Sequence, residues 1–203
     1  MTTSGLSACI ITRNEADRIG PCIEALRFCD EIVVVDAHST DETRAIAEGL
    51  GARVIERDWP GYRSQKQFAT DAARHDWVLC VDADEIVTPA LRAEIEALRA
   101  AGFAAERGWS IPRLTDYFGR FLRHGNAWPD RQIRLYDRRA ARWVGYEVHE
   151  KIAVDGPVGT LRQPLEHYAY RSLDDHLAKL DRYAKRGGCI YERNREYCGR
   201  WLK

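Results

Sequence analysis

The chain has 203 residues, and 45% of them are hydrophobic, which is enough apolar material for one sizeable core. Its 31 Lys and Arg residues equal its 31 Asp and Glu residues, so the net charge indicates no particular partner. The distribution is uneven, because we count 12 basic and 19 acidic residues through Pro112 but 19 basic and 12 acidic residues after it. A basic second half suits a phosphate-bearing partner or a membrane surface, although ordinary surface variation also produces such a difference.

The six cysteines form no C-x-x-C pair, and two of them, Cys9 and Cys80, lie inside apolar runs. We therefore predict reduced packing residues in a cytosolic protein, and neither a disulfide framework nor a zinc site. The N-terminus lacks the basic and then apolar pattern of a signal peptide. No apolar run approaches the roughly 20 residues that span a bilayer, so any membrane contact is expected to be peripheral.

Strand-like and helix-like segments alternate through the first hundred residues. Apolar runs predict strands over 6–12, 31–36, 52–56 and 77–81. Helical spacing predicts a helix around Ile19–Leu26 that Asn14 and Asp17 can cap, a second from Ser39-Thr40-Asp41 to about Leu50, and two more over 62–74 and 89–100. Strands that alternate with helices of this length indicate right-handed crossovers and a mainly parallel sheet, as in a nucleotide-binding α/β half.

The usual phosphate-binding loops are missing from this half. Neither G-x-G-x-x-G nor G-x-x-x-x-G-K-[ST] follows any of the predicted strands. A Rossmann dehydrogenase and a P-loop NTPase are therefore disfavoured. If a nucleotide binds here, we expect a metal ion and side chains to hold its phosphates.

The pattern changes after Ala101, where glycines, prolines and aromatic residues become frequent. Short strands are predicted over 109–111, 131–136, 142–144, 152–154 and 161–170, with a mobile loop over 119–127. Ser172 is expected to cap a long helix that continues to about Tyr197, with Leu173, Leu177 and Leu180 on one face. No internal repeat or interdomain linker interrupts the chain.

The predicted strand over 77–81 ends abruptly in Asp82, Ala83, Asp84 and Glu85. In α/β proteins ligands bind beyond the carboxyl ends of such strands, and crowded carboxylates repel each other unless a cation offsets their charge. Mg²⁺ or Mn²⁺, which prefer oxygen ligands, are the natural candidates, and the metal would face the phosphates of a nucleotide-linked substrate. The alternative is a solvated turn before the helix that Pro89 opens.

Polar clusters end three of the four predicted strands, namely Asn14-Glu15, Asp36, and Asp82 with Asp84 and Glu85. Because the carboxyl ends of parallel strands share one edge of a sheet, we expect these clusters to be neighbours in space. Asp36 is suited to accept hydrogen bonds from a base or a ribose, whereas Glu15 either does the same or complements the dipole of the following helix. Lys66, on the helix before the fourth strand, either donates to the nucleotide or is a solvated helical lysine.

Several of these segments resemble a known enzyme family. Ile10–Asn14 (IITRN), Val33–Asp41 (VVVDAHSTD) and Val81–Glu85 (VDADE) resemble the nucleotide-sugar half of family 2 glycosyltransferases, which have a GT-A fold. The second half resembles bacterial lipopolysaccharide core β-1,4-glucosyltransferases at Trp128–Tyr136 (WPDRQIRLY), at Val148–Glu150 (VHE) and at Glu166–Tyr170 followed by Leu177–Tyr183.

The resemblance implies an α/β protein of the GT-A type. Its Rossmann-like, mainly parallel sheet would be flanked by helices and joined to a smaller, irregular β-containing acceptor half and a long C-terminal helix. A single glycosyltransferase domain would span 1–203, with the nucleotide-sugar half over 1–101 and the acceptor half over 102–203.

The resemblance also implies roles for individual donor-site residues. Thr12 and Asp36 would contact the uridine, and the further nucleotide-sugar-binding residues would be Asn14, Glu15, Lys66 and Ala83. Asp82 would face the ribose or the metal. Asp84 would coordinate the metal that bridges the two phosphates, and His149 would complete the metal shell, a role that His167 fits as well.

The chemistry of an inverting transfer adds a base to this set. The acceptor hydroxyl attacks C1 while the nucleotide diphosphate leaves through an oxocarbenium-like transition state. A carboxylate must take the hydroxyl proton, and a cation must stabilise the charge that grows on the diphosphate. Asp130 is the expected base and Glu150 its rival, while Arg134 either orients Asp130, meets a phosphate or lies at the surface. The aromatic residues that form either a sugar platform or part of the core are Trp109, Tyr117, Phe118 and Trp128.

The resulting hypothesis is an inverting, metal-assisted transferase that moves a hexose from a UDP-sugar to an inner-core sugar of lipopolysaccharide. Glucose is the first candidate for this hexose. It would work on the cytoplasmic face of the inner membrane as a peripheral protein, and no nucleic-acid partner is expected. The alternative keeps the chemistry but uses another cell-envelope glycan or a polyprenyl-phosphate acceptor. A metal-dependent nucleotidyltransferase usually has an early Gly-rich basic loop, which is absent between Thr12 and Arg18. A catalytically idle binding module would not need the complete set of Asp36, Asp82, Asp84 and Asp130.

Overall fold

The computed structural model describes residues 4–103, 105–125, 128–145, 150–178 and 181. Its helices are α1 (Ile19–Ala25), α2 (Thr43–Gly49), α3 (Tyr62–Ala72) and α4 (Pro89–Ala100). Its strands are β1 (Leu6–Thr12), β2 (Glu31–Asp36), β3 (Arg53–Glu56), β4 (Trp77–Asp82), β5 (Glu85–Val87), β6 (Gly108–Thr115), β7 (Asp130–Asp137), β8 (Ala141–Val144), β9 (Lys151–Val154), β10 (Val158–Thr160) and β11 (Leu165–His167). A further helical segment covers 173–178. None of the helices in the described ranges is long and apolar enough to cross a membrane.

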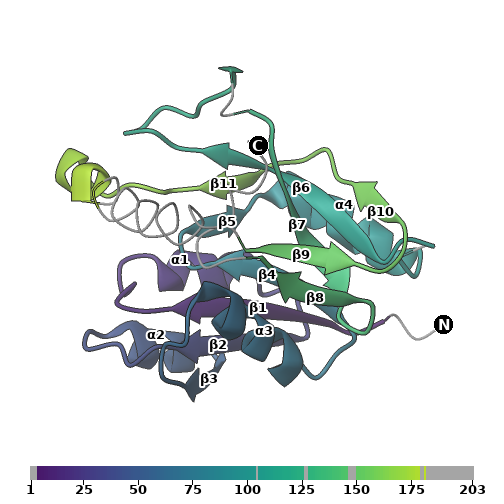
Figure 1. Ribbon diagram of the computed structural model, residues 1–203, viewed down its shortest axis with the longest axis horizontal. Coiled ribbons are helices and arrows are strands. Elements are labelled where there is room, and N and C mark those ends of the chain that lie inside the picture. The colour runs from purple at the N-terminus through teal and green to yellow at the C-terminus, as the bar shows by residue number, and fades with distance from the viewer. Residues whose placement is uncertain (1–3, 104, 126–127, 146–149, 179–180, 182–203) are drawn as a thin grey trace, which may run out of the picture.

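One sheet runs through both halves of the chain (Figure 1). Its strand order is β3-β2-β1-β4-β7-β6-β11-β5, with β10 paired to β6. β1 is parallel to both β2 and β4, and β2 is parallel to β3, whereas β7 is antiparallel to β4 and to β6. β8 and β9 form a separate antiparallel pair. The predicted α/β class is confirmed, and the sheet becomes mixed where the second half joins it.

The residues of β1 alternate between two apolar clusters, because successive side chains of a strand point to opposite faces of the sheet. Leu6, Ala8 and Ile10 belong to the cluster that includes residues of α1 and α4. Cys9 and Ile11 belong to the cluster that includes residues of α3 and β8. Both faces of β1 are covered, and all of its residues are buried, as the continuous apolar run predicts.

The elements predicted for the first half are confirmed, but the residues predicted to cap α1 and α2 do not occupy the N-cap positions. β1, β2 and α4 have the predicted ranges, and the other strands and helices agree to within a few residues. The prediction that Asn14 and Asp17 cap α1 is wrong, because Arg18 occupies the N-cap position and no side chain makes a capping hydrogen bond. Glu42 holds the N-cap position of α2, also without such a bond, although Asp41 from the predicted capping segment accepts from the Thr43 backbone N–H at 3.0 Å. Ser39 is engaged elsewhere, as shown below.

The second half departs further from the prediction. Where the second half joins the first, Glu85, for which the sequence predicts no strand, begins β5, which pairs with β11. The predicted strand over 161–170 is too long, because β10 ends at Thr160 and β11 covers only three residues. Phe121, inside the predicted loop over 119–127, makes a β-bridge to Asp116, and residues 126–127 lie outside the described part. Most of the long helix predicted from Ser172 also lies outside it.

The cysteines in the described part of the chain are free thiols, as predicted. Cys9, Cys22 and Cys80 are buried, and burial raises the pKa of each of these thiols above its ordinary value. A buried thiol with a raised pKa stays protonated and acts as a small apolar side chain. Cys189 and Cys198 lie outside the described residues.

The carboxyl ends of β1, β2 and β4 lie side by side at one edge of the sheet. Thr12 is the register partner of Asp36, and Ile11 is the register partner of Asp82. The segments that follow these three strands are therefore neighbours, as the parallel arrangement predicts. The sheet has brought residues that are far apart in the sequence to a single edge.

Candidate active site

A cavity of about 1200 Å³ opens at this edge of the sheet and is lined from both halves of the chain. Eight of the eleven residues singled out from the sequence line it: Thr12, Asn14, Glu15, Lys66, Asp82, Ala83, Asp84 and Glu150. Asp36 and Asp130 are not part of this lining, and His149 falls outside the described residues. The predicted donor side and the predicted acceptor side therefore meet in one cavity.

Asp82 lies between two cations in the cavity wall. Lys66 Nζ is 3.0 Å from Asp82 Oδ1, and Arg134 Nη2 donates to Asp82 Oδ2 at 2.8 Å. Burial opposes the ionisation of Asp82, but the charges of Lys66 and Arg134 outweigh it and lower the pKa of this carboxyl. Asp82 is therefore ionised, with a protein cation on each oxygen, which is the arrangement that makes a buried carboxylate tolerable.

Lys66 also connects Asp82 to the second half of the chain. Its Nζ also lies 3.1 Å from Glu150 Oε1 and 5.0 Å from the centre of the Trp143 ring. Burial alone lowers the pKa of Lys66, but the nearby charge of Asp82 reverses the shift and raises it. Lys66 is 4% exposed, so the alternative that it is a solvated helical lysine is wrong.

Arg134 extends the same network in the opposite direction. Its Nη2 lies 2.5 Å from Glu85 Oε1, and Arg113 Nη1 lies 3.4 Å from the same oxygen. Arg113 in turn donates to Asp130 Oδ2 through Nε at 2.8 Å and through Nη2 at 2.5 Å. A chain of alternating charges thus crosses the molecule in the order Glu150, Lys66, Asp82, Arg134, Glu85, Arg113 and Asp130.

Asp130, at one end of this chain, is held on both oxygens. Besides the two contacts from Arg113, Gln132 Nε2 donates to Asp130 Oδ1 at 2.7 Å. Burial raises the pKa of Asp130, but the charge of Arg113 outweighs this effect, and the net pKa is lowered. A carboxylate that already accepts these bonds is a weak acceptor for a further proton. Glu150, at the other end, lines the cavity and accepts from Lys66 through one oxygen.

Asp84 lines the cavity beside a histidine. His167 Nε2 and Arg18 Nη1 each lie 3.6 Å from Asp84 Oδ2. Burial opposes ionisation, but the interaction with His167 outweighs it, so that the pKa of Asp84 is lowered. Among the residues that the structure describes, no group of three or more His, Cys, Asp and Glu side chains is placed to hold a metal ion by itself. An ionised carboxylate with an imidazole beside it fits a divalent ion whose other ligands are water and substrate phosphates.

Asn14 and Asp36 shape the two loops that follow β1 and β2. Buried Asp36 accepts from the Ser39 backbone N–H at 2.7 Å and from the Ser39 hydroxyl at 2.5 Å. Ser39 Oγ accepts from the Asn14 N–H at 2.8 Å, and Asn14 Oδ1 accepts from the Thr40 N–H at 2.8 Å. Asn14 has a φ of 55°, a left-handed conformation that asparagine tolerates better than most residues. These bonds join the two loops into one unit beside the cavity.

Thr12 has a hydroxyl whose hydrogen-bonding capacity is unused. Its side chain is buried and lines the cavity, and Oγ1 has no hydrogen-bond partner among the described residues. A buried hydroxyl without a partner costs about 1–3 kcal/mol. Such groups are rare in folded proteins unless a ligand or water pairs with them, so Thr12 marks a point at which a ligand is expected to bind.

Arg171 ties the segment after β11 to the loop after β1. Its Nη2 lies 2.6 Å from Glu15 Oε2, and its Nε and Nη2 donate to Asp17 at 2.8 and 2.7 Å. Burial raises the pKa of Glu15 in spite of the attraction of Arg171. In this structure Glu15 is therefore the partner of a cation from the second half, an arrangement that neither interpretation of its sequence position anticipated.

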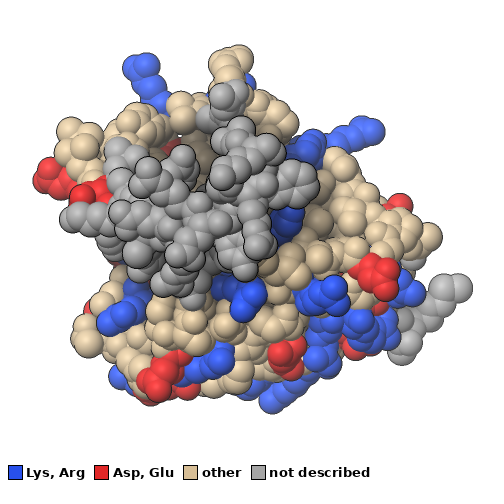
Figure 2. Space-filling model, viewed as in Figure 1, with Lys and Arg blue, Asp and Glu red and all other residues tan. Residues whose placement is uncertain are grey.

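Two cavity residues, Arg113 and Arg171, were not found by sequence reasoning. Arg113 lies in β6 and Arg171 follows β11, and neither stretch contains a nucleotide-binding motif. The available signal was the excess of basic residues after Pro112, to which both belong. That excess does not distinguish cavity arginines from surface arginines. Figure 2 shows that Lys and Arg are interspersed with Asp and Glu over the lower part of one face.

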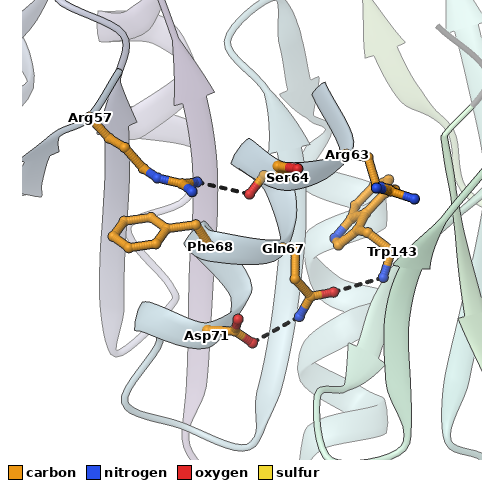
Figure 3. Close-up of a pocket in the computed structure, with 7 residues that line it drawn as sticks. All are labelled: Arg57, Arg63, Ser64, Gln67, Phe68, Asp71 and Trp143. Carbon is orange, nitrogen blue, oxygen red and sulfur yellow. Dashed lines mark hydrogen bonds between the residues drawn. The ribbon is translucent and has the colours of Figure 1, made fainter. Parts of the chain in front are cut away.

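A smaller hollow of about 320 Å³ lies between α3 and β8 (Figure 3). Its polar side chains are occupied with one another. Gln67 donates to Asp71 at 2.8 Å and accepts from the Trp143 N–H at 2.9 Å, while Arg57 donates to the Ser64 carbonyl at 2.9 Å. The larger cavity is lined from both halves of the chain and includes the unpartnered Thr12 hydroxyl, and it is therefore the candidate active site.

Comparison with solved structures shows the fold. The crystal structure of S. aureus TarS 1-349 in complex with UDP-GlcNAc has a TM-score of 0.61, and the match covers 83% of this chain and 59% of that chain at 16% identity. Mannosyl-3-phosphoglycerate synthase from Rubrobacter xylanophilus also gives a TM-score of 0.61, with 98% and 76% of the two chains covered at 19% identity. The expected GT-A fold is confirmed by these likenesses.

Comparison of sequences shows the family. The chain is 36% identical over 186 residues to the lipopolysaccharide core biosynthesis glycosyltransferase LpsC of Rhizobium meliloti (strain 1021), which covers 88% of this chain and 68% of the relative. It is 33% identical over 199 residues to an uncharacterized glycosyltransferase of Rickettsia bellii (strain RML369-C), with 91% and 66% covered. The chain spans about two thirds of the length of these relatives. The model for glycosyl transferase family 2 matches residues 7–167, and the chain belongs to this family.

Proposed function

We propose that this chain is an inverting hexosyltransferase that uses a UDP-sugar as donor and a sugar of the lipopolysaccharide core as acceptor. The name of the relative LpsC supports the acceptor class, and the UDP-GlcNAc in the TarS structure supports the donor class. The observation that carries the proposal is that one cavity joins Thr12 and Asp84, from the donor edge of the sheet, to Glu150 from the second half. A donor site and a carboxylate suited to activate an acceptor thus face the same space.

The donor half over 1–101 supplies the nucleotide site. The unused Thr12 hydroxyl pairs with the uridine, and the loops that Asn14 and Asp36 hold together form the wall on which the nucleoside lies. Asp36 contributes mainly through Ser39, because both of its oxygens already accept from that residue. Ala83, between two acidic residues, leaves room for the ribose and the diphosphate.

Asp84 and His167 would hold a divalent cation, Mg²⁺ or Mn²⁺, beside the phosphates of the donor. When bound, the cation offsets the negative charge that the leaving diphosphate acquires. Two protein ligands suffice, because Mg²⁺ in nucleotide sites usually keeps several waters and phosphate oxygens in its shell. His149, which the sequence suggested as a ligand, remains a candidate for a third position. Asp82 serves the site through Lys66 and Arg134, which occupy its oxygens.

Glu150 takes the proton of the acceptor hydroxyl. The hydroxyl oxygen forms the new bond to C1 of the sugar, the bond from C1 to the diphosphate oxygen breaks on the opposite side, and the configuration at C1 inverts. This assignment replaces Asp130, the base favoured from the sequence, because the carboxylate of Asp130 is held by Arg113 and Gln132 and lies outside the cavity lining. Lys66 keeps Glu150 oriented toward the cavity.

The acceptor side of the cavity is basic. Arg131 and Lys151 line it, and a phosphate-bearing sugar of the inner core suits these charges. Glucose is the proposed hexose. The alternative keeps the same chemistry with another cell-envelope glycan or a polyprenyl phosphate as acceptor. In either case the protein would work at the cytoplasmic face of the inner membrane, where a UDP-sugar and an anchored acceptor are both available.

A screen of nucleotide sugars with and without Mn²⁺ tests the donor and the metal together. Thermal unfolding should shift upward with one UDP-hexose, more strongly when Mn²⁺ is present, since binding to the native state stabilises it. Asp84→Asn should remove the Mn²⁺-dependent part of the shift, whereas the matched control Asp71→Asn, in the smaller hollow, should keep it. Equal shifts for all variants with and without Mn²⁺ would remove the metal from the proposal.

Transfer of a labelled hexose then tests the acceptor. Truncated lipopolysaccharide core, another envelope glycan and a polyprenyl phosphate are offered with the UDP-hexose found in the screen. Label on the core sugar is the expected result, and label on another acceptor selects the alternative. Release of pyrophosphate from a nucleoside triphosphate and a sugar phosphate, without any sugar transfer, would instead indicate a nucleotidyltransferase.

A further inference from the structure

The indole of Trp143 forms part of the wall of both hollows. Trp143 lies in β8, is buried, and lines the large cavity as well as the smaller hollow between α3 and β8. Its ring faces the ammonium group of Lys66, with Nζ 5.0 Å from the ring centre. An ammonium group over the face of an aromatic ring is attracted by the negative charge density of that face, most strongly when the ring belongs to tryptophan.

Hydrogen bonds fix the indole at both ends. The Trp143 backbone N–H donates to Gln67 Oε1 at 2.9 Å (Figure 3). At the other end, Nε1 donates to the hydroxyls of Tyr136 and Thr70 at 3.2 and 3.3 Å. Gln67 and Thr70 both belong to α3, the helix that also contains Lys66. The ring is therefore held in one position relative to this helix.

The hydrogen bonds lead back to the residue whose charge the indole covers. The Thr70 hydroxyl donates to the Lys66 carbonyl at 2.9 Å, and Thr70 Oγ1 lies 2.8 Å from the Tyr136 hydroxyl. Because each hydroxyl has one proton, the proton between the two hydroxyls belongs to Tyr136, and both oxygens can accept from the indole N–H. Trp143 is thus connected to Lys66 at two points, through its ring at the ammonium group and through these bonds at the backbone.

The position of the ammonium group determines how Glu150 is held. Lys66 Nζ lies 3.1 Å from Glu150 Oε1 and 3.0 Å from Asp82 Oδ1. An ammonium group has three N–H donors, and two of them suffice for these two carboxylates. The Trp143 ring attracts the same charge but supplies no oxygen that competes for these donors. Lys66 therefore stays with both carboxylates, and Glu150, held at Oε1, keeps Oε2 for another proton.

We propose that Trp143 is a positioning residue for sugar transfer, which holds the ammonium group of Lys66 against Glu150 and thereby orients this carboxylate toward the acceptor hydroxyl. The inference rests on the proposed function, in which Glu150 takes the proton of that hydroxyl. The indole of Trp143 neither accepts nor releases this proton. Its contribution is to keep the base in the geometry that the reaction needs.

Transfer kinetics of two variants test this role. Trp143→Leu, which removes the ring face, should lower kcat by about tenfold, the scale of one largely desolvated cation–π contact. Trp143→Phe keeps a ring beside the ammonium group and should recover most of the loss. The KM values for donor and acceptor and the calorimetric affinity for UDP should stay close to those of the wild type, because the contact acts on the step after binding.

The matched control is Phe68→Leu. The guanidinium of Arg57 lies 4.3 Å from the centre of the Phe68 ring, so this variant removes a comparable contact between a cation and a ring. Phe68 lines the smaller hollow and not the large cavity. Its replacement should therefore leave kcat unchanged.

Chemical labelling of Lys66 provides a measurement that needs no transfer activity. Reductive methylation followed by mass spectrometry should be slow at Lys66 in the wild type and faster in Trp143→Leu, because the ring covers the ammonium group. Trp143→Phe should label near the wild-type rate. Lys151, which is exposed, should be labelled at the same rate in all three proteins.

A double variant shows whether the ring acts through Lys66. If it does, Trp143→Leu/Lys66→Met should lose little kcat beyond the loss in Lys66→Met alone, since coupled residues are not additive. A further tenfold loss would overturn the proposal, because Trp143 would then act independently of Lys66. Thermal unfolding is measured for every variant, and the labelling of Lys66 does not depend on the folding of Lys66→Met.

Two other results would overturn the proposal. The first is equal labelling of Lys66 in the wild type and Trp143→Leu. The second is a raised KM or a weakened UDP affinity in Trp143→Leu with kcat unchanged, which would make Trp143 a direct contact of a substrate. Absence of transfer by the wild type would defeat the proposed function. The labelling would then still decide whether the ring holds Lys66.

Discussion

Buried Lys66 and partly buried Asp82 form an ion pair at the candidate active site, with Nζ 3.0 Å from Oδ1. Lys66 comes from α3 and Asp82 from the end of β4, and the same ammonium group also contacts Glu150 from the second half. One side chain thus connects the D-x-D segment to the proposed base. Because Lys66 is buried and Asp82 is mostly covered, removing either member takes away one of the two opposite charges beside the other in a poorly solvated place.

Lys66→Met should therefore lower both stability and transfer. We expect a loss of roughly 3 kcal/mol in the free energy of unfolding, the scale at which broken buried ion pairs destabilise proteins. Urea unfolding measures this loss. Arg27→Met is the matched control, because its pair with Glu24 is exposed and should contribute little to stability. Equal unfolding midpoints for Lys66→Met and the wild type would show that Lys66 does not stabilise the chain of charges.

Thr12→Val separates ligand binding from folding at a single hydroxyl. Thr12 Oγ1 has no hydrogen-bond partner among the described residues, so its replacement by a methyl group removes an unsatisfied polar atom. Stability should stay the same or rise slightly, while UDP affinity should fall by roughly three- to tenfold, the equivalent of one hydrogen bond. Calorimetric titration with UDP checks the affinity. Unchanged UDP affinity would mean that the nucleotide does not contact this hydroxyl.

The donor edge was predictable from the sequence because it depends on local patterns. The run Leu6–Thr12 is continuous and apolar, and such runs form buried parallel strands whose carboxyl ends share one edge. Glu85 shows where local patterns fail. Its sequence neighbours predict no strand, but Glu85 begins β5 because β11, some eighty residues later, pairs with it and Arg134 neutralises it. No spacing in the sequence predicts the pairing of β5 with β11 or the ion pair between Glu85 and Arg134.

The environment of Asp130 could not be predicted from the sequence either. Asp130 is the register partner of Arg113 in the pairing of β6 with β7, and this register depends on an irregularity between Trp109 and Ser110. A register shift of one residue turns side chains to the other face of a sheet. The sequence identified a suitable carboxylate but held no information on whether it would meet an arginine or an open cavity.

Acid should weaken the fold through Asp137. Hydrogen bonds from Arg139, together with one from Arg107, lower the pKa of this carboxyl in the folded state. A lowered pKa in the folded state means that the contribution is fully present above the unfolded value of about 4 and is lost as the pH falls through the folded value. Asp137→Asn should therefore unfold more easily than the wild type at neutral pH, by roughly 2 kcal/mol.

The pH dependence of this difference is the decisive measurement. Urea unfolding of Asp137→Asn and the wild type should differ at neutral pH and converge as the pH falls through the lowered pKa of Asp137, where its carboxyl becomes protonated in the folded state. The control is Asp58→Asn, because Asp58 is fully exposed and contributes little to folding. A gap between Asp137→Asn and the wild type that stays constant down to low pH would show that the ionised form of Asp137 is not what stabilises the fold.

The choice of base is tested by comparing Glu150→Gln with Asp130→Asn. Glutamine keeps an oxygen for the hydrogen bond from Lys66 but cannot take a proton, so Glu150→Gln should lower kcat by about 10²- to 10⁴-fold and leave UDP-sugar affinity nearly unchanged. Asp130→Asn should lower kcat much less, because its carboxylate serves Arg113 and Gln132. Initial rates at saturating donor and calorimetric affinities measure both effects. The surface variant Glu48→Gln controls for the loss of one negative charge. Near-normal turnover in Glu150→Gln together with inactive Asp130→Asn would return the role of base to Asp130, and would mean that the bonds from Arg113 and Gln132 are released when the acceptor binds.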